Sequence, residues 1–115
     1  MKNFSEIEYN GKKLKLVFNL NVMEAIQNEF GSVDNWGKLT DGASGEVNIK
    51  ALKFGFTEMI NEAIDIENDE NGTDIPFYSS KQVARIISDL GMEQATKALN
   101  ETVIDSTKDD SGKNA

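Results

Sequence analysis

The sequence predicts an α+β fold that is mostly α-helical, with an N-terminal two-stranded β-hairpin followed by about four helices. Two alternating runs flank Asn10-Gly11, and apolar residues recur at helical spacing through most of the remaining chain. Capping residues and glycines mark most of the helix ends. With 115 residues, of which 38% are hydrophobic, the chain is long enough for one core. We therefore expect one globular domain over 1–105.

The hairpin prediction rests on Asn10-Gly11, because both central positions of a two-residue type I′ loop need a positive φ. This loop length pairs Tyr9 with Lys12 and Ile7 with Leu14. One face of the hairpin then carries apolar side chains, and the other carries two cross-strand Glu–Lys pairs, as in a sheet with one solvated face. The apolar face comprises Ile7, Tyr9, Leu14, Leu16 and Phe18, and the pairs are Glu6–Lys15 and Glu8–Lys13.

The helices are predicted from apolar spacing, and their ends from caps. Asn21 is expected to cap the first helix. Ser79, with Gln82 three residues later, is expected to cap the helix over 79–90. Ile49 and Met92 are expected on buried stripes. The predicted helices cover about 21–30, 48–66, 79–90 and 92–105, with at most a short helix over 34–39.

Two polar segments are predicted to lie outside the helices. Residues 67–74 should form a loop, and 106–115, which have no apolar side chain before Ala115, should form a disordered tail. The loop nearly matches a calcium-binding loop when Gly72 takes the obligatory glycine position. The closing bidentate glutamate is missing, because Tyr78 stands there. We therefore expect a solvated loop and no metal site.

Composition argues against catalysis and against several partners. The chain contains neither histidine nor cysteine, so the commonest general base, the thiolate nucleophile and the commonest zinc ligands are missing. The net charge of −8 disfavours direct binding of nucleic acid. No run reaches membrane-spanning length, and no apolar signal segment precedes the domain, so we expect a cytoplasmic protein without membrane contact. We expect no enzymatic activity, no catalytic residue and no cofactor.

Two aromatic residues are candidates for partner binding. Phe54 falls on the polar side of the longest predicted helix, and Trp36 lies in a turn-rich segment whose periodicity does not bury it. Exposed aromatic side chains are frequent hot spots of interfaces. The alternative for Phe54 is a solitary exposed apolar residue without a role, since much folded surface is apolar.

The order of segments resembles that of the tail assembly chaperones of long-tailed phages and prophages of Gram-positive bacteria. In both, a strand precedes a helix that closes on a Glu-Phe-Gly type sequence, here Glu29-Phe30-Gly31. A long central helix follows, then a Ser-Ser-Lys-Gln-Val helix beginning near Ser79, and a closing helix. The resemblance covers about 5–105, and it departs at Gln82-Val83, where the family has Glu-Val.

This resemblance implies a non-enzymatic protein of the host cytosol that is not part of the mature virion. It implies two partners, the tape-measure protein, which such chaperones coat, and the tail-tube protein, whose subunits they help to recruit. A homo-oligomer is a further option. The alternative is a small acidic adaptor or mimic that binds a basic host protein, which the net charge favours.

Overall fold

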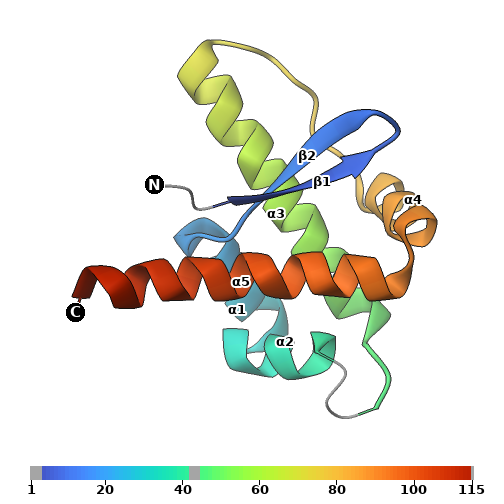
Figure 1. The fold of residues 1–115 in the computed structure, drawn as a ribbon, viewed down its shortest axis with the longest axis vertical. Coiled ribbons are helices and arrows are strands. Elements are labelled where there is room, and N and C mark those ends of the chain that lie inside the picture. The colour runs from blue at the N-terminus through green and yellow to red at the C-terminus, as the bar shows by residue number, and fades with distance from the viewer. Residues whose placement is uncertain (1–3, 42–44, 115) are drawn as a thin grey trace.

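The chain begins with an antiparallel hairpin of β1 (Phe4–Tyr9) and β2 (Lys12–Val17), and five helices follow (Figure 1). The computed structural model describes residues 4–41 and 45–114, with side chains described as far as Ile104. The predicted class is confirmed, with one helix more than the four expected. The helices are α1 (Leu20–Phe30), α2 (Val33–Thr40), α3 (Ile49–Asn71), α4 (Ser80–Leu90) and α5 (Met92–Asn114).

The hairpin has the predicted register. Asn10 and Gly11 adopt φ values of 53° and 76°, as a type I′ turn requires, and Tyr9 pairs with Lys12. The Tyr9 hydroxyl donates a 2.7 Å hydrogen bond to Asp89 of α4. This bond raises the pKa of Tyr9, because the phenolate would face a carboxylate. The predicted apolar residues of the hairpin, apart from the half-buried Tyr9, are buried: Ile7, Leu14, Leu16 and Phe18.

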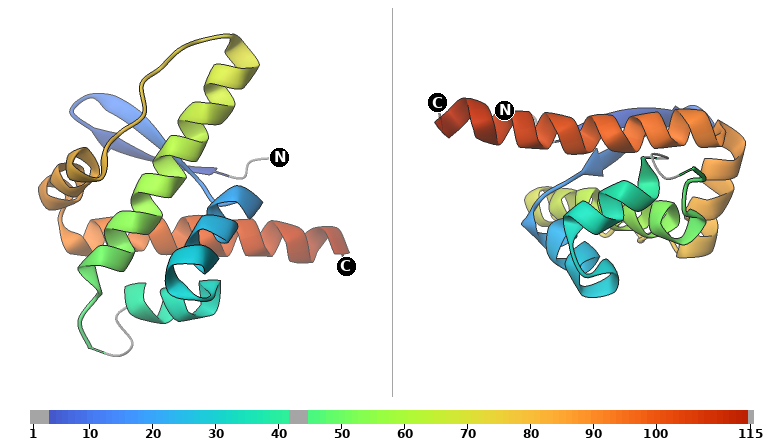
Figure 2. Two further views of the ribbon diagram at one scale, coloured as in Figure 1. Left: turned by 180° about the vertical axis from the view of Figure 1, so that it is seen from behind. Right: turned by 90° about the horizontal axis from the view of Figure 1, so that it is seen from below.

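The long helix α3 organises the domain. It packs against β2, while α5 runs beside β1, so the hairpin and α5 lie side by side over α3 (Figures 1 and 2). Viewed from behind, α3 runs through the centre with α1 on one side and α4 on the other (Figure 2). The C-terminal turns of α3 extend past the hairpin. In the part of the chain that the structure describes, no helix carries an apolar stretch long enough to cross a membrane.

The boundaries of α1 and α3 differ from the prediction. Helix α1 is capped by Asn19, whose side chain accepts a 3.2 Å hydrogen bond from the Val22 amide, and Asn21 is already helical. Helix α3 continues to Asn71 and ends at Gly72, which has a φ of 65°. The predicted loop over 67–71 is therefore helix, because no residue before Gly72 breaks it. The predicted Ser79 cap, with Gln82 in a capping box, is confirmed.

Helix α5 continues beyond the predicted end near residue 105, as far as Asn114. Its described side chains end at Ile104, which is exposed. The predicted disorder of 106–115 and the domain boundary at 105 stay predictions.

The core brings together the hairpin and all five helices. Two residues expected on buried stripes are exposed instead: Ile49 has 56% of its surface accessible and Met92 40%. Each is the first residue of its helix, so no preceding helical turn covers its side chain. Both therefore contribute apolar area to the surface of the protein.

Candidate partner-binding surfaces

The structure places no candidate metal centre among its described residues. No group of three or more acidic side chains is arranged to hold an ion within the described parts of the chain. Glu67, Asp69 and Asn71, which would be ligands in the calcium-loop alignment, lie in the last turns of α3. Because a helix spaces these side chains around its axis, the alignment with a calcium loop fails.

Trp36 lies in the core, so the expectation of an unburied side chain is wrong. Only 1% of its surface is accessible, and its indole N–H donates a 2.9 Å hydrogen bond to the Ala51 carbonyl. The ring stacks beside Phe18, with 6.2 Å between centroids, and lies directly over Gly55 of α3. A side chain enclosed in this way offers no surface to a partner.

Phe54 lies on the outer side of α3 and is half-buried. Its ring packs edge-to-face on Phe30 of α1, with 5.4 Å between centroids and 80° between the ring planes. The remaining exposed face borders an open hollow of about 450 Å³. Phe54 is therefore both a packing residue and a surface residue.

The hollow beside Phe54 shares two lining residues with a second hollow, and together they form what we call the Ile49 surface. The second hollow measures about 150 Å³ and lies between the first turns of α3 and the last turns of α4. Ile49 and Lys53 line both hollows, and the exposed Met92 borders the second. The remaining lining residues are Lys50, Phe54 and Ser80 for the first hollow, and Leu52, Ala84, Ile87 and Ser88 for the second.

The charged residues that line the Ile49 surface are two lysines, Lys50 and Lys53, and glutamates lie close to them. Lys50 forms a 3.1 Å ion pair with Glu29 of α1, across the same side of α3 that carries Phe54. One turn further along, burial and the neighbouring Glu62 raise the pKa of Glu58 above its ordinary value. The Glu62 carboxylate in turn accepts hydrogen bonds from the Asn19 and Asn21 side chains, of 2.8 and 2.9 Å.

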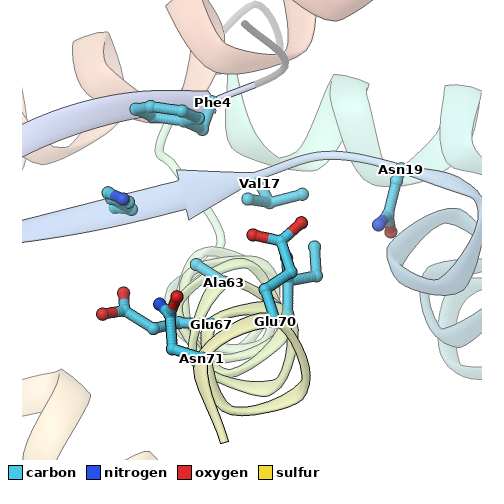
Figure 3. Close-up of a pocket in the computed structure, with 9 residues that line it drawn as sticks. Phe4, Val17, Asn19, Ala63, Glu67, Glu70 and Asn71 are labelled. Carbon is cyan, nitrogen blue, oxygen red and sulfur yellow. The ribbon is translucent and has the colours of Figure 1, made fainter.

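Another groove lies between the hairpin and the C-terminal half of α3, and we call it the arm groove. Figure 3 shows Phe4 and Val17 on the hairpin side, and Ala63, Glu67 and Glu70 on the helix side. This part of the groove measures about 350 Å³. A second part, of about 160 Å³, shares three lining residues with it and extends to the segment after α3. The shared residues are Lys15, Ala63 and Glu67.

Two asparagines hold the helix side of the arm groove in place. The Asn61 side chain donates to the Tyr78 carbonyl (3.0 Å) and accepts from the Tyr78 amide (2.8 Å). Asn68 does the same for Ile75, at 3.1 and 2.9 Å. The two residues are seven apart and so share one face of α3. The segment returning to α4 is thus fastened along the C-terminal half of α3.

Sequence reasoning missed most of these surface residues. Ile49 and Met92 have the spacing of core residues, and nothing in their local sequence predicts exposure. Asn61 and Asn68 carry a weak signal, since an Asn pair seven residues apart can fasten a neighbouring segment. The arm groove depends on how far α3 extends, which was predicted five residues too short, at 66 rather than 71.

Searches against protein-family models, curated proteins and solved structures found no match for this chain.

Proposed function

We propose that this chain is a non-enzymatic tail assembly chaperone of a long-tailed phage or prophage. It binds the tape-measure protein before tail assembly and helps to recruit tail-tube subunits. The observation that carries the proposal is the Ile49 surface, an apolar and partly hollow face next to the Phe30–Phe54 pair. The segment order described above supplies the family.

The Ile49 surface suits a helical, apolar client. Large exposed apolar side chains beside shallow hollows are typical of grooves that accept an amphipathic helix. Ile49 and Met92 are open to solvent without a partner chain, so covering them removes apolar area from water. Phe54 adds an aromatic anchor already fixed by Phe30, which reduces the entropy lost on binding.

Co-expression with the candidate tape-measure protein tests this proposal. We expect the client to remain soluble and to co-purify with the chain. Ile49→Ser should abolish co-purification with little effect on melting temperature, because an exposed side chain contributes little to the core. The matched control is Ile104→Ser on α5, since Ile104 is 57% exposed and Ile49 is 56% exposed.

Two results would contradict the proposal. The first is failure of every form of the chain to co-purify with the client. The second is equal loss of the client from Ile49→Ser and Ile104→Ser, which would mean that capture depends on general surface hydrophobicity rather than on this face.

Phe54→Ala is a less specific variant than Ile49→Ser, since Phe54 also packs on Phe30. We expect it to weaken client binding by about 1–3 kcal/mol, as truncations of aromatic anchors do. We also expect a loss of stability below the roughly 3–5 kcal/mol of a fully buried phenylalanine, because part of the ring is exposed. A stability loss in that upper range would assign Phe54 to the core alone.

A further inference from the structure

We infer that the arm groove binds a cationic, amphipathic segment of a partner protein. The groove is distinct from the Ile49 surface, so this inference does not depend on the tape-measure protein being the client. Its lining combines apolar side chains with charged ones, and the charge selects the occupant.

The groove offers apolar area on both sides. Phe4 and Val17 line it from the hairpin, and Ala63 and Ile66 from α3. Its second part adds Ile64 of α3 and Ile75 of the returning segment, which is partly exposed. A segment lying along the groove would therefore contact apolar side chains over both parts, which together extend along the C-terminal half of α3.

The helix side of the groove is strongly acidic. Residues 58–74 contain seven acidic residues and no lysine or arginine. Glu67 and Glu70 line the groove itself, and Glu67 borders both of its parts. The seven are Glu58, Glu62, Asp65, Glu67, Asp69, Glu70 and Asp74. This stretch alone accounts for most of the net charge of −8.

The hairpin side offsets only part of this charge. Lys13 and Lys15 line the groove, and the strand register places Glu8 and Glu6 opposite them on the hairpin. The Lys15 ammonium also lies 4.9 Å from the centre of the Phe4 ring, where it is held by a cation–π contact. The solvated face of the hairpin is thus close to neutral, and the field of the groove is set by α3.

These features select one class of occupant. Apolar side chains of the ligand would fill the groove, and lysine or arginine side chains at its edge would meet Glu67 and Glu70. An anionic segment would be repelled by the acidic stretch of α3. The fastened α3 end, with Asn61 and Asn68 bonded to the returning segment, provides a rigid wall that loses little entropy on binding.

Peptide titration tests the inference on the full chain. The first probe is a labelled amphipathic helix of leucine, alanine and lysine, about 18 residues long, or roughly 27 Å. The second probe replaces its lysines by glutamate, and the third replaces its leucines by serine. Fluorescence anisotropy should show saturable one-to-one binding of the first probe only. Absence of binding by the first probe, or equal binding by the second or third, would overturn the inference.

A charge-matched pair of variants locates the site. The double variant Glu67→Gln/Glu70→Gln should weaken binding of the first probe roughly three- to tenfold, because each partly screened ion pair contributes a modest factor. The control, Glu24→Gln/Glu93→Gln, removes the same charge from exposed positions on α1 and α5 and should change binding less than about twofold. Equal effects of the two variants would mean that the peptide responds only to net charge, and would also overturn the inference.

Amide chemical shifts distinguish this groove from the Ile49 surface. The first probe should perturb the amides of Val17, Ala63 and Ile66 and leave those of Ile49 and Lys53 unchanged. The reverse pattern would assign the peptide to the Ile49 surface and would refute the arm groove as its site. Neither pattern bears on whether the tape-measure protein co-purifies, so the two proposals fail separately.

Discussion

Gly55→Ala should destabilise this protein, although the same change in the interior of most helices is stabilising. A Cβ atom at Gly55 would lie 2.4 Å from Cζ2 of Trp36, with Cε2 at 3.0 Å and Nε1 at 3.1 Å. The closest approach is roughly 1 Å short of ordinary carbon–carbon contact. The indole cannot move freely, since it is buried and hydrogen-bonded to Ala51.

The magnitude follows from opposing contributions. Overpacking a core costs about 1–3 kcal/mol, and weakening the indole hydrogen bond costs about 0.5–1.5 kcal/mol. The better helix propensity of alanine returns about 0.8–1 kcal/mol. We expect a net loss of about 1–3 kcal/mol in the free energy of unfolding. At roughly 4 °C per kcal/mol for a chain of this size, the melting temperature should fall by roughly 4–12 °C.

The control is Gly37→Ala in α2, where a Cβ atom meets nothing within 4 Å. We expect this variant to gain about 0.5–1 kcal/mol, because alanine is the better helix former. Urea denaturation, monitored by circular dichroism, measures the free energy of unfolding of both variants. In addition, Trp36→Phe should cost less in the Gly55→Ala background than in the original chain, because the smaller ring relieves the overlap. If both alanine variants stabilise the protein equally, Trp36 does not pack on Gly55, and our account of the core is wrong.

Three further predictions concern the contacts around α3. Asn19→Ala should lower the free energy of unfolding by about 1–2 kcal/mol, because it removes the cap of α1. Asn21→Ala should cost less, because it loses only an exposed hydrogen bond to Glu62. Urea denaturation of the two variants compares these losses. Asn61→Ala should lower the melting temperature and speed amide hydrogen exchange in the segment between α3 and α4, because the Tyr78 amide and carbonyl lose their partner. Unchanged exchange in this segment would contradict the fastening role of Asn61. Because the pKa of Glu58 is raised in the fold, protonated Glu58 favours folding at pH values below the ordinary glutamate pKa, and this contribution is lost as the pH rises through the raised value. Glu58→Gln should therefore stabilise the fold at neutral pH and not at acidic pH, and equal effects at both pH values would refute the sign of the shift.

The hairpin was predictable because its determinants are local. Asn10-Gly11 permits one tight turn, and that turn sets the register and hence the buried face. Helix existence was predictable for the same reason, and so was the cap at Ser79. At α1 the sequence predicted Asn21 as the cap, whereas the cap is Asn19, and the bonds of both side chains to Glu62 are not visible in the sequence.

The surfaces were less predictable because they depend on contacts between distant segments. The burial of Trp36 requires a glycine on another helix, Gly55, and no periodicity within α2 reveals it. The exposure of Ile49 and Met92 depends on how the ends of α3, α4 and α5 meet. The arm groove required the full length of α3 and the path of the segment that follows it. Local patterns determined the elements, while their mutual packing determined the candidate sites.

The most direct test of the central claim is calorimetric titration of the chain with a purified helical segment of the candidate tape-measure protein, at low and at high salt. If the Ile49 surface captures an apolar helix, the affinity should change little with salt, the heat capacity change should be negative, and Ile49→Ser should abolish binding. Binding that disappears at high salt and survives Ile49→Ser would contradict the account, and would favour an acidic adaptor that recognises a basic partner by charge.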